Sequence, residues 1–371
     1  MRLRGLLVLG ATALAGCAHT EPFQPLDTST NRPFLPGTPV RLTYNPGADL
    51  RPAWLPDGSA FVYAWQQYNQ SDKDRCLSFL EVSGGSRFDT ICNPDPFAVD
   101  SADLFDSPSP SPNGEILYAR SSSRLGAPAP EHGGVFFGTL ADPLSATKVL
   151  NLPYGIPGGR IHGAISTARW LSARSLVYIG QSANYAREFL GCPLDTVVTG
   201  LEVVAMNLSG AQPELAVIPF TDGASSIALT AGRDTLYFTL NGDSKVYRLE
   251  LATGQVSIAH DFGALGIARD VTVLGARLVA VVGGEIEFTE GTLGPLQFDG
   301  GGNLVSVDLA TGAETQLPVD HPMVFRKPEF APAGDRVRLV VEGLPVGTLS
   351  GGCDWHELLS KVGDLYLYEA P

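Results

Sequence analysis

The chain has few basic residues for its size. Its 371 residues include 25 Lys and Arg against 39 Asp and Glu, which gives a net charge of -14 at pH 7. Because such a surface repels polyphosphate and anionic lipid, the charge argues against nucleic acid as a main partner and against membrane attachment by electrostatics alone. Charged residues make up only 17% of the chain, whereas Gly and Pro contribute 42 and 28 residues. This composition favours strands and turns over helices.

The sequence also lacks the common catalytic signatures. It contains no nucleophile elbow, no Walker loop and no dinucleotide fingerprint at a position that a strand-and-turn fold would support. We therefore expect no catalytic residues and no cofactor, and we keep an enzyme as the alternative.

The apolar run at the N-terminus is too short to span a bilayer. Met1–Arg4 carry two arginines, Gly5–Ala13 are small and apolar, and Leu14–Cys17 reads Leu-Ala-Gly-Cys. A basic region, a short apolar region and small residues before a cleavage point predict a secretory signal. The last four residues resemble the lipobox of bacterial lipoproteins, and an ordinary cleaved signal is the alternative.

The lipobox resemblance has consequences for location. It implies that residues 1–16 are removed as a signal peptide and that Cys17 is acylated, so the protein is anchored in the bacterial cell envelope, facing the periplasm or at the cell surface. Ala18, and not an aspartate, follows the cysteine, which for the resembled proteins implies the outer membrane.

A short strand-like run that ends in a turn recurs six times. The clearest copy is Pro52–Gly58 (PAWLPDG) before Phe61–Tyr63, and Pro108–Gly114 and Pro328–Gly334 match it. Repeats of this length that consist only of strands stack radially around an axis. The equivalent positions, 43 to 60 residues apart, are Trp54, Pro110, Trp170, Leu229, Thr272 and Phe330.

A third strand is visible within several units. Lys245–Leu251 and Asn303–Leu309 alternate in polarity and precede Ala-Thr-Gly turns. The last unit ends at Asp364–Glu369, one strand short, and Pro39–Thr43 can supply the missing strand. We therefore predict an all-β fold, a six-bladed β-propeller of four-stranded antiparallel blades closed by an N-terminal strand that completes the last blade. Residues 39–371 form this single domain, and residues 17–38 form the lipidated cysteine and a flexible tether.

The pattern Pro-x-Trp-x-Pro-Asp-Gly before an apolar strand resembles the TolB-type repeat, a WD-like propeller blade of bacterial envelope proteins. The resemblance covers nearly all of residues 39–371 and implies a six-bladed β-propeller that often serves as a binding platform. The third and fifth units depart from it, because Trp170–Arg174 and Val273–Arg277 lack the Pro-Asp-Gly turn. Those two assignments rest on spacing.

Four cysteines remain after Cys17, and an oxidising compartment favours disulfides between them. Cys76 and Cys92 flank a predicted hairpin, so we expect them to pair near its open end. Cys192 and Cys353 lie in insertions of the third and sixth units, which are opposite blades of a six-membered ring. They can pair only if both insertions lean over one face, because the two Cα atoms must come within ~7 Å.

Four arginines lie just before or within the first strand of their units: Arg51, Arg169, Arg269 and Arg326. The first strand of a propeller blade lines the central channel, so these residues are predicted to form a local positive binding site. A guanidinium offers a rigid fork of donors that suits a carboxylate, a sulfate or an acidic side chain of a partner. The alternative is that the arginines pair with Asp49, Asp270 and Glu329 and stabilise the ring.

We predict no metal site. Cys353–Glu357 is the densest cluster of donor side chains, and Glu285–Glu290 with Asp299 offers oxygen atoms that would suit calcium. A disulfide cysteine and a solvated hairpin are the simpler interpretations of these two runs.

The sequence thus favours a lipid-anchored envelope propeller that binds or scaffolds, with envelope proteins or a small anionic ligand as partners. We expect a monomer that contacts the membrane only through the lipid on Cys17. The alternative is a propeller enzyme, a lyase or hydrolase of envelope glycans at the channel mouth, since the fold alone is compatible with both.

Overall fold

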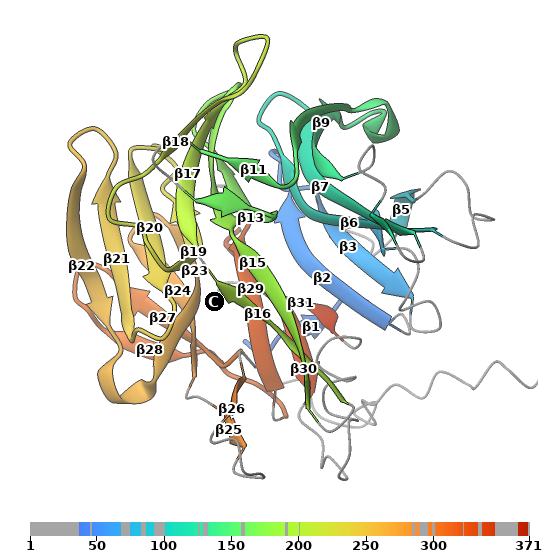
Figure 1. Cartoon of the computed structure of the whole chain (residues 1–371). Coiled ribbons are helices and arrows are strands. Elements are labelled where there is room, and N and C mark those ends of the chain that lie inside the picture. The colour runs from blue at the N-terminus through green and yellow to red at the C-terminus, as the bar shows by residue number, and fades with distance from the viewer. Residues whose placement is uncertain are drawn as a thin grey trace, which may run out of the picture. The chain divides into compact units, whose positions relative to one another are not determined.

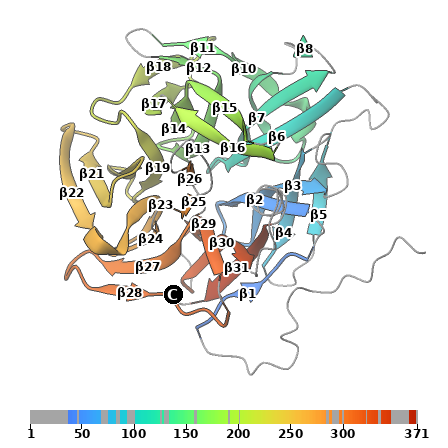
Figure 2. The ribbon, with the colours of Figure 1, turned by 60° about the horizontal axis from the view of Figure 1, so that its bottom comes forward.

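The regular structure is almost entirely antiparallel β-sheet, and the sheets surround a common axis as the blades of a propeller (Figure 1, Figure 2). The structure is a computed structural model. It describes residues 37–44, 47–67, 75–82, 87–92, 101–124, 127–128, 133–156, 160–189, 192–199, 201–283, 286–288, 296–298, 301–321, 323–332, 336–345 and 363–369, all within the unit Pro36–Pro371.

The first two blades belong to one nine-stranded sheet. The first blade contains β2 (Gly47–Trp54), β3 (Ala60–Gln67), β4 (Arg75–Glu81) and β5 (Arg87–Ile91). The second contains β6 (Ser101–Pro110), β7 (Glu115–Arg124), β9 (Gly134–Thr139) and β10 (Thr147–Asn151), with the short β8 (Ala127–Pro128) beside β7. A parallel contact between Arg75 and Leu104 joins the two blades.

The other blades of the described chain are separate four-stranded sheets. The third contains β13 (Ala164–Trp170), β14 (Ser175–Gln181), β17 (Glu202–Asn207) and β18 (Glu214–Val217). The fourth contains β19 (Ala224–Leu229), β20 (Thr235–Leu240), β21 (Lys245–Glu250) and β22 (Gln255–Asp261). The fifth contains β23 (Ile267–Leu274), β24 (Arg277–Gly283), β27 (Asn303–Asp308) and β28 (Glu314–Gln316). The sixth contains β29 (Met323–Phe330), β30 (Arg338–Pro345), β31 (Asp364–Glu369) and β1 (Val40–Arg41).

Smaller elements lie between the blade strands. Within the described ranges, two 3-10 turns are Pro143–Ser145 and Gly263–Leu265. The same ranges contain three two-stranded ribbons: β11 (Tyr154–Gly155) with β12 (Ile161–His162), β15 (Ala183–Phe189) with β16 (Cys192–Thr199), and β25 (Ile286–Phe288) with β26 (Leu296–Phe298). The last two ribbons are the insertions that lengthen the third and fifth units. No helix among the described residues is long and apolar enough to cross a membrane.

The N-terminal strand completes the last blade, as predicted. Val40 pairs with Leu367, and the backbone N–H of Leu42 donates to the carbonyl of Leu365 at 2.7 Å. The hydroxyl of the buried Thr43 accepts from the N–H of Leu365 at 2.8 Å. These contacts cover the outer edge of β31, which would otherwise present unpaired backbone groups.

The repeat positions predicted from spacing are correct in five blades. Each pairs with a fully buried residue at the start of the second strand, as Trp54 does with Phe61. In the fifth blade the residue that pairs with buried Leu278 is Val273, one position after Thr272. The reason is the short turn there, in which Leu274 pairs directly with Arg277.

The apolar core lies between neighbouring blades. Trp54 of the first blade packs in one cluster with Val340 of the sixth, and Trp170 of the third packs with Leu117 of the second. Trp54 and Trp170 therefore join their blades to the blade before, at positions where large aromatic side chains bury the most apolar area.

Candidate functional site

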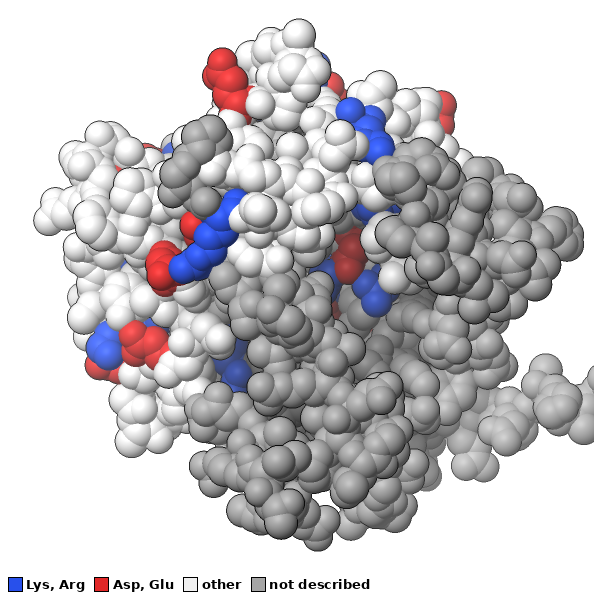
Figure 3. All heavy atoms as spheres, in the orientation of Figure 1, with Lys and Arg blue, Asp and Glu red and all other residues white. Residues whose placement is uncertain are grey.

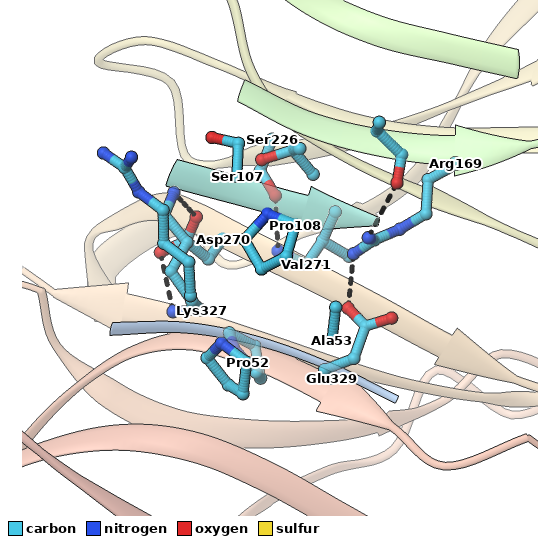
Figure 4. Close-up of a pocket in the computed structure, with 14 residues that line it drawn as sticks. Pro52, Ala53, Ser107, Pro108, Arg169, Ser226, Asp270, Val271, Lys327 and Glu329 are labelled. Atoms are coloured by element: carbon cyan, nitrogen blue, oxygen red, sulfur yellow. Dashed lines mark hydrogen bonds and ion pairs between the residues drawn. The ribbon is translucent and has the colours of Figure 1, made fainter. Parts of the chain in front are cut away.

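The innermost strands of all six blades line one small cavity on the propeller axis (Figure 4). Its lining includes Arg51 of β2, Arg169 of β13, Asp270 of β23, and Lys327 and Glu329 of β29. The space open to the centre of a water-sized sphere is about 40 Å³. Since one water needs roughly 10–15 Å³ on this measure, the cavity has room for about three waters or a small ion.

Beta-bulges direct the side chains of the inner strands. The pairing register shifts within every inner strand. A bulge bends its strand and changes the direction of its side chains. A non-glycine residue in the left-handed backbone conformation costs ~1–3 kcal/mol, which the surrounding structure must offset. Four such residues have φ between 45 and 53°: Arg51, Ser107, Thr167 and Lys327.

The bulges also explain the first proline of the repeat. Pro52, Pro108 and Pro328 directly follow three of the left-handed residues and have no partner in the strand register. Proline lacks an N–H donor, so it is tolerated within a sheet at such a position. In these three blades the first proline of the repeat therefore marks the part of the inner strand that faces the axial cavity.

Arg51 forms an ion-paired cluster with the second blade. Its guanidinium contacts the carboxylate of Asp106, which lies 2.7 Å from Nη1 of Arg75. The backbone N–H of Arg51 donates to Oε1 of Glu342. Burial acts to raise the pKa of Asp106, but Arg51 and Arg75 outweigh it and hold that pKa below the usual value. Burial prevails at Glu342 and raises its pKa, although Arg326 opposes this.

Lys327 and Asp270 join the sixth blade to the fifth. The Lys327 Nζ lies 2.6 Å from Oδ1 of Asp270, and the Lys327 N–H donates to Oδ2 at 3.1 Å. Burial acts to raise the pKa of Asp270, but Lys327 outweighs burial, so the pKa is lowered. This carboxylate stays ionised at neutral pH and holds the bulge of β29 in place.

Arg169 reaches across the axis to Glu329. The two residues belong to the third and sixth blades, and the Arg169 guanidinium donates to the Glu329 carboxylate (Figure 4). Burial raises the pKa of Glu329, and Arg169 counteracts this only in part. The cavity thus contains carboxylates of two kinds, with pKa values displaced in opposite directions.

The four arginines singled out from the sequence all lie on inner strands, in different settings. Arg51 and Arg169 line the axial cavity. Arg269 lines a neighbouring hollow of about 30 Å³ that also contains Asp270 and Lys327. Arg326 lines neither, and its Nε lies 3.9 Å from Glu342.

Of the pairings considered as the alternative, Arg169 does meet Glu329. Asp270 pairs with Lys327, and the charge of Arg326 also acts on it. Asp49 is fully buried, and its backbone N–H donates to the carbonyl of Gly363 at 2.8 Å.

Sequence reasoning missed Lys327, Asp106 and Glu342. An alignment of the first and sixth units on Pro52 and Pro328 would have identified Lys327, because it occupies the position equivalent to Arg51. The two carboxylates carry no such signal. Asp106 precedes a bulge and Glu342 lies on a second strand, so their direction toward the axis depends on the twist and bulging of the sheets.

The cysteines were predicted in two pairs. Cys76 and Cys92 form a disulfide at the open end of the β4–β5 hairpin, with Cα atoms 4.6 Å apart. Cys192 begins β16, but Cys353 lies outside the described residues, so that pairing stays a prediction. Cys17 also lies outside them.

Metal ligands were considered in two runs. Cys353–Glu357 lies outside the described residues, as do Glu285, Glu290 and Asp299. Within the described ranges, no group of three or more His, Cys, Asp or Glu side chains is placed to hold a metal ion.

A second buried polar cluster lies within the third blade and its β11–β12 ribbon. His162 lies 2.9 Å from Oε1 of Glu202 and 3.2 Å from the Tyr154 hydroxyl, which lies 2.6 Å from the hydroxyl of Tyr178. Burial lowers the pKa of His162, opposed by Glu202. The histidine is fully buried and lines neither cavity, so we interpret the cluster as structural.

Comparison with known proteins supports the fold and no narrower assignment. No protein-family model matches the chain, and no curated protein matches it. Among solved structures, it resembles regucalcin from Agrobacterium tumefaciens, described as a calcium-binding protein, at 16% identity and a TM-score of 0.54 over 90% of this chain and 95% of that one.

Two further solved structures are similar over much of the chain. A gluconolactonase from Xanthomonas campestris is 13% identical, with a TM-score of 0.49 and 89% of each chain covered. TolB from Acinetobacter baumannii is 14% identical, with a TM-score of 0.46 over 84% of this chain and 64% of that one. Because the same fold carries different functions, the likeness to propeller proteins says nothing about the reaction or the ligand.

Proposed function

We propose that this protein is a cell-envelope binding module, anchored through lipid on Cys17, that holds a small anion or an acidic group of a partner at the axis of its propeller. The observation that carries the proposal is the charge of the axial cluster, which we define as the charged side chains that line the cavity together with those linked to them by ion pairs or hydrogen bonds. Five basic side chains (Arg51, Arg75, Arg169, Arg326, Lys327) meet four acidic ones (Asp106, Asp270, Glu329, Glu342).

The excess of basic groups contrasts with the rest of the chain. The whole sequence has a net charge of -14, and several basic side chains on the face in Figure 3 lie beside acidic ones. Burial also raises the pKa of Glu329 and Glu342, which disfavours their negative form. An anion entering the cavity therefore meets a positive local potential.

The size of the cavity favours a small ligand. Pockets that bind drug-sized molecules have volumes of ~300–1,000 Å³, whereas only about 40 Å³ here admits the centre of a water-sized sphere. A single carboxylate or sulfate suits this space better than a glycan does. Partly exposed Arg51 and Lys327, at 37% and 33% side-chain exposure, provide the first contacts from solvent.

One observation favours the enzyme as a second candidate. The pKa values of Glu329 and Glu342 are raised while those of Asp106 and Asp270 are lowered, which is the pattern of general acids and bases. Turnover of an envelope glycan that is lost in Glu329→Gln would favour this candidate over a binding module.

The test of the binding proposal is a calorimetric titration of the full-length protein with sulfate and with acetate. The Arg51→Gln/Arg169→Gln variant should lose at least tenfold in affinity, because both guanidiniums line the cavity. Arg336→Gln is the matched control, since Arg336 is 71% exposed and lines neither cavity. Equal affinities in the variant and the control would refute the proposal.

The lipid anchor needs a separate test. Cys17→Ser should move the protein from the membrane fraction to the soluble fraction of fractionated cells. A protein that stays with the membrane after this change would contradict the anchor.

A further inference from the structure

The Arg169–Glu329 pair differs from the other ion pairs of the axial cluster. Arg51–Asp106 and Lys327–Asp270 join neighbouring blades, whereas Arg169 and Glu329 join opposite blades across the axis. Each residue lies two positions after the left-handed residue of its bulge, Thr167 or Lys327. Equivalent positions in opposite blades face each other through the cavity, and here one is basic and the other acidic.

Glu329 also has fewer charged partners and donors than the two aspartates of the axial cluster. Asp106 accepts from two arginines and from the N–H of Ser107, and Asp270 accepts twice from Lys327. In the described part of the chain, the side chain of Glu329 has one charged partner, Arg169. Removing a carboxylate from water costs free energy, and a single donor offsets less of this cost than several donors do.

The backbone of Glu329 is held independently of its side chain. The carbonyl accepts from Nε1 of Trp54 at 2.9 Å, and the following N–H, of Phe330, donates to Oγ1 of Thr272 at 3.2 Å. These contacts come from the first and fifth blades. The carboxylate can therefore leave Arg169 by side-chain rotation while the ring stays closed.

From these contacts we infer that Glu329 is an internal competitor of the ligand, so that a carboxylate ligand binds by displacing the Glu329 carboxylate from Arg169. The inference rests on the proposed function and specifies its ligand class. The contact with Glu329 shows that the Arg169 guanidinium can bind a carboxylate in this position. The cavity has room for a group of that size. No bond between heavy atoms forms or breaks; the displaced Glu329 carboxylate either takes up a proton from solvent or turns toward water.

The competition makes anion binding dependent on pH. The charged groups that line the cavity with Glu329 are Arg169 of β13, Arg51 of β2, Asp270 of β23 and Lys327 of its own strand, and Asp106 of β6 and Glu342 of β30 contact Arg51. Asp106 and Asp270 have lowered pKa values and stay ionised as the pH falls toward 5, whereas the pKa values of Glu329 and Glu342 are raised, and of these two only Glu329 contacts Arg169. Protonation of Glu329 releases Arg169, so affinity should rise as the pH falls.

The experiment titrates acetate into the full-length protein at several pH values between 5.5 and 8. In Glu329→Gln, which keeps the shape and removes the charge, acetate should bind at least tenfold more tightly at pH 7 with a weaker pH dependence. Glu329→Asp, whose side chain is one methylene shorter, should also bind acetate more tightly than the wild type. This second variant replaces Glu329→Gln in the test if Glu329→Gln does not fold. Glu250→Gln is the matched control, because Glu250 pairs with Arg248 at 2.7 Å on β21.

The outcomes separate the inference from the proposed function. If acetate binds the wild-type protein and Arg169→Gln abolishes binding, while both Glu329 variants bind like the wild type, the competitor role is wrong and the anion site stands. If no variant binds acetate, including Glu329→Gln, both are wrong.

Discussion

Replacing Thr43 with valine should loosen the strand that closes the propeller. The Thr43 hydroxyl accepts a hydrogen bond from the N–H of Leu365 at 2.8 Å, and both residues are buried, with 4% and 0% exposure. Valine has nearly the same shape as threonine but no acceptor. Water cannot readily replace the lost partner, so Thr43→Val leaves a buried N–H unsatisfied.

An unsatisfied buried donor costs ~1–3 kcal/mol. In a domain of this size the loss corresponds to a fall in Tm of roughly 1–4 °C. The measurement is thermal and urea unfolding of Thr43→Val beside Thr315→Val, a control on the exposed outer strand β28. If the two variants unfold alike, the hydroxyl does not stabilise the closure and the reasoning is wrong.

Two further predictions concern covalent and electrostatic stabilisation. Removal of the disulfide in Cys76→Ser/Cys92→Ser should cost ~3 kcal/mol of unfolding free energy, and an unchanged urea midpoint would contradict this. Burial raises the pKa of Asp364 to about 6, although Arg41 at 2.6 Å opposes the shift. Because the folded protein holds this proton more tightly than the unfolded chain does, the contribution of Asp364 to stability grows as the pH falls through 6 toward 4. Between pH 7 and pH 5 the free energy of unfolding of the wild type should therefore rise by about 1 kcal/mol relative to that of Asp364→Asn. If stability depends on pH in the same way in both proteins, this prediction is wrong.

The blade architecture was accessible from the sequence because its signals are local and repeated. The turn of Pro56–Gly58 shows this, since the Asp57 carboxylate accepts from the Ser59 N–H at 3.0 Å and Gly58 has a φ of 68°. Such a turn is encoded by adjacent residues. The fifth unit was misplaced by one residue for the same reason, because its short turn carries none of these markers.

The candidate site was accessible only in outline. The sequence indicates that Arg51 and Arg169 lie on inner strands. An alignment of the repeats does not show which strands contain a bulge or where the bulge lies. That is why Arg326 was singled out and Lys327 was overlooked, although Lys327 is the residue that lines the cavity. A shift of one residue turns a side chain to the other face of a strand.

The sequence by itself therefore determined the repeat, the number of strands in a unit, the closing strand and the local disulfide, because each depends on residues close in the chain or on a regular spacing. Only the tertiary structure decided which charges meet at the axis. Arg169 and Glu329 are 160 residues apart, and they are brought together by the curvature of the ring and by bulges in two separate blades.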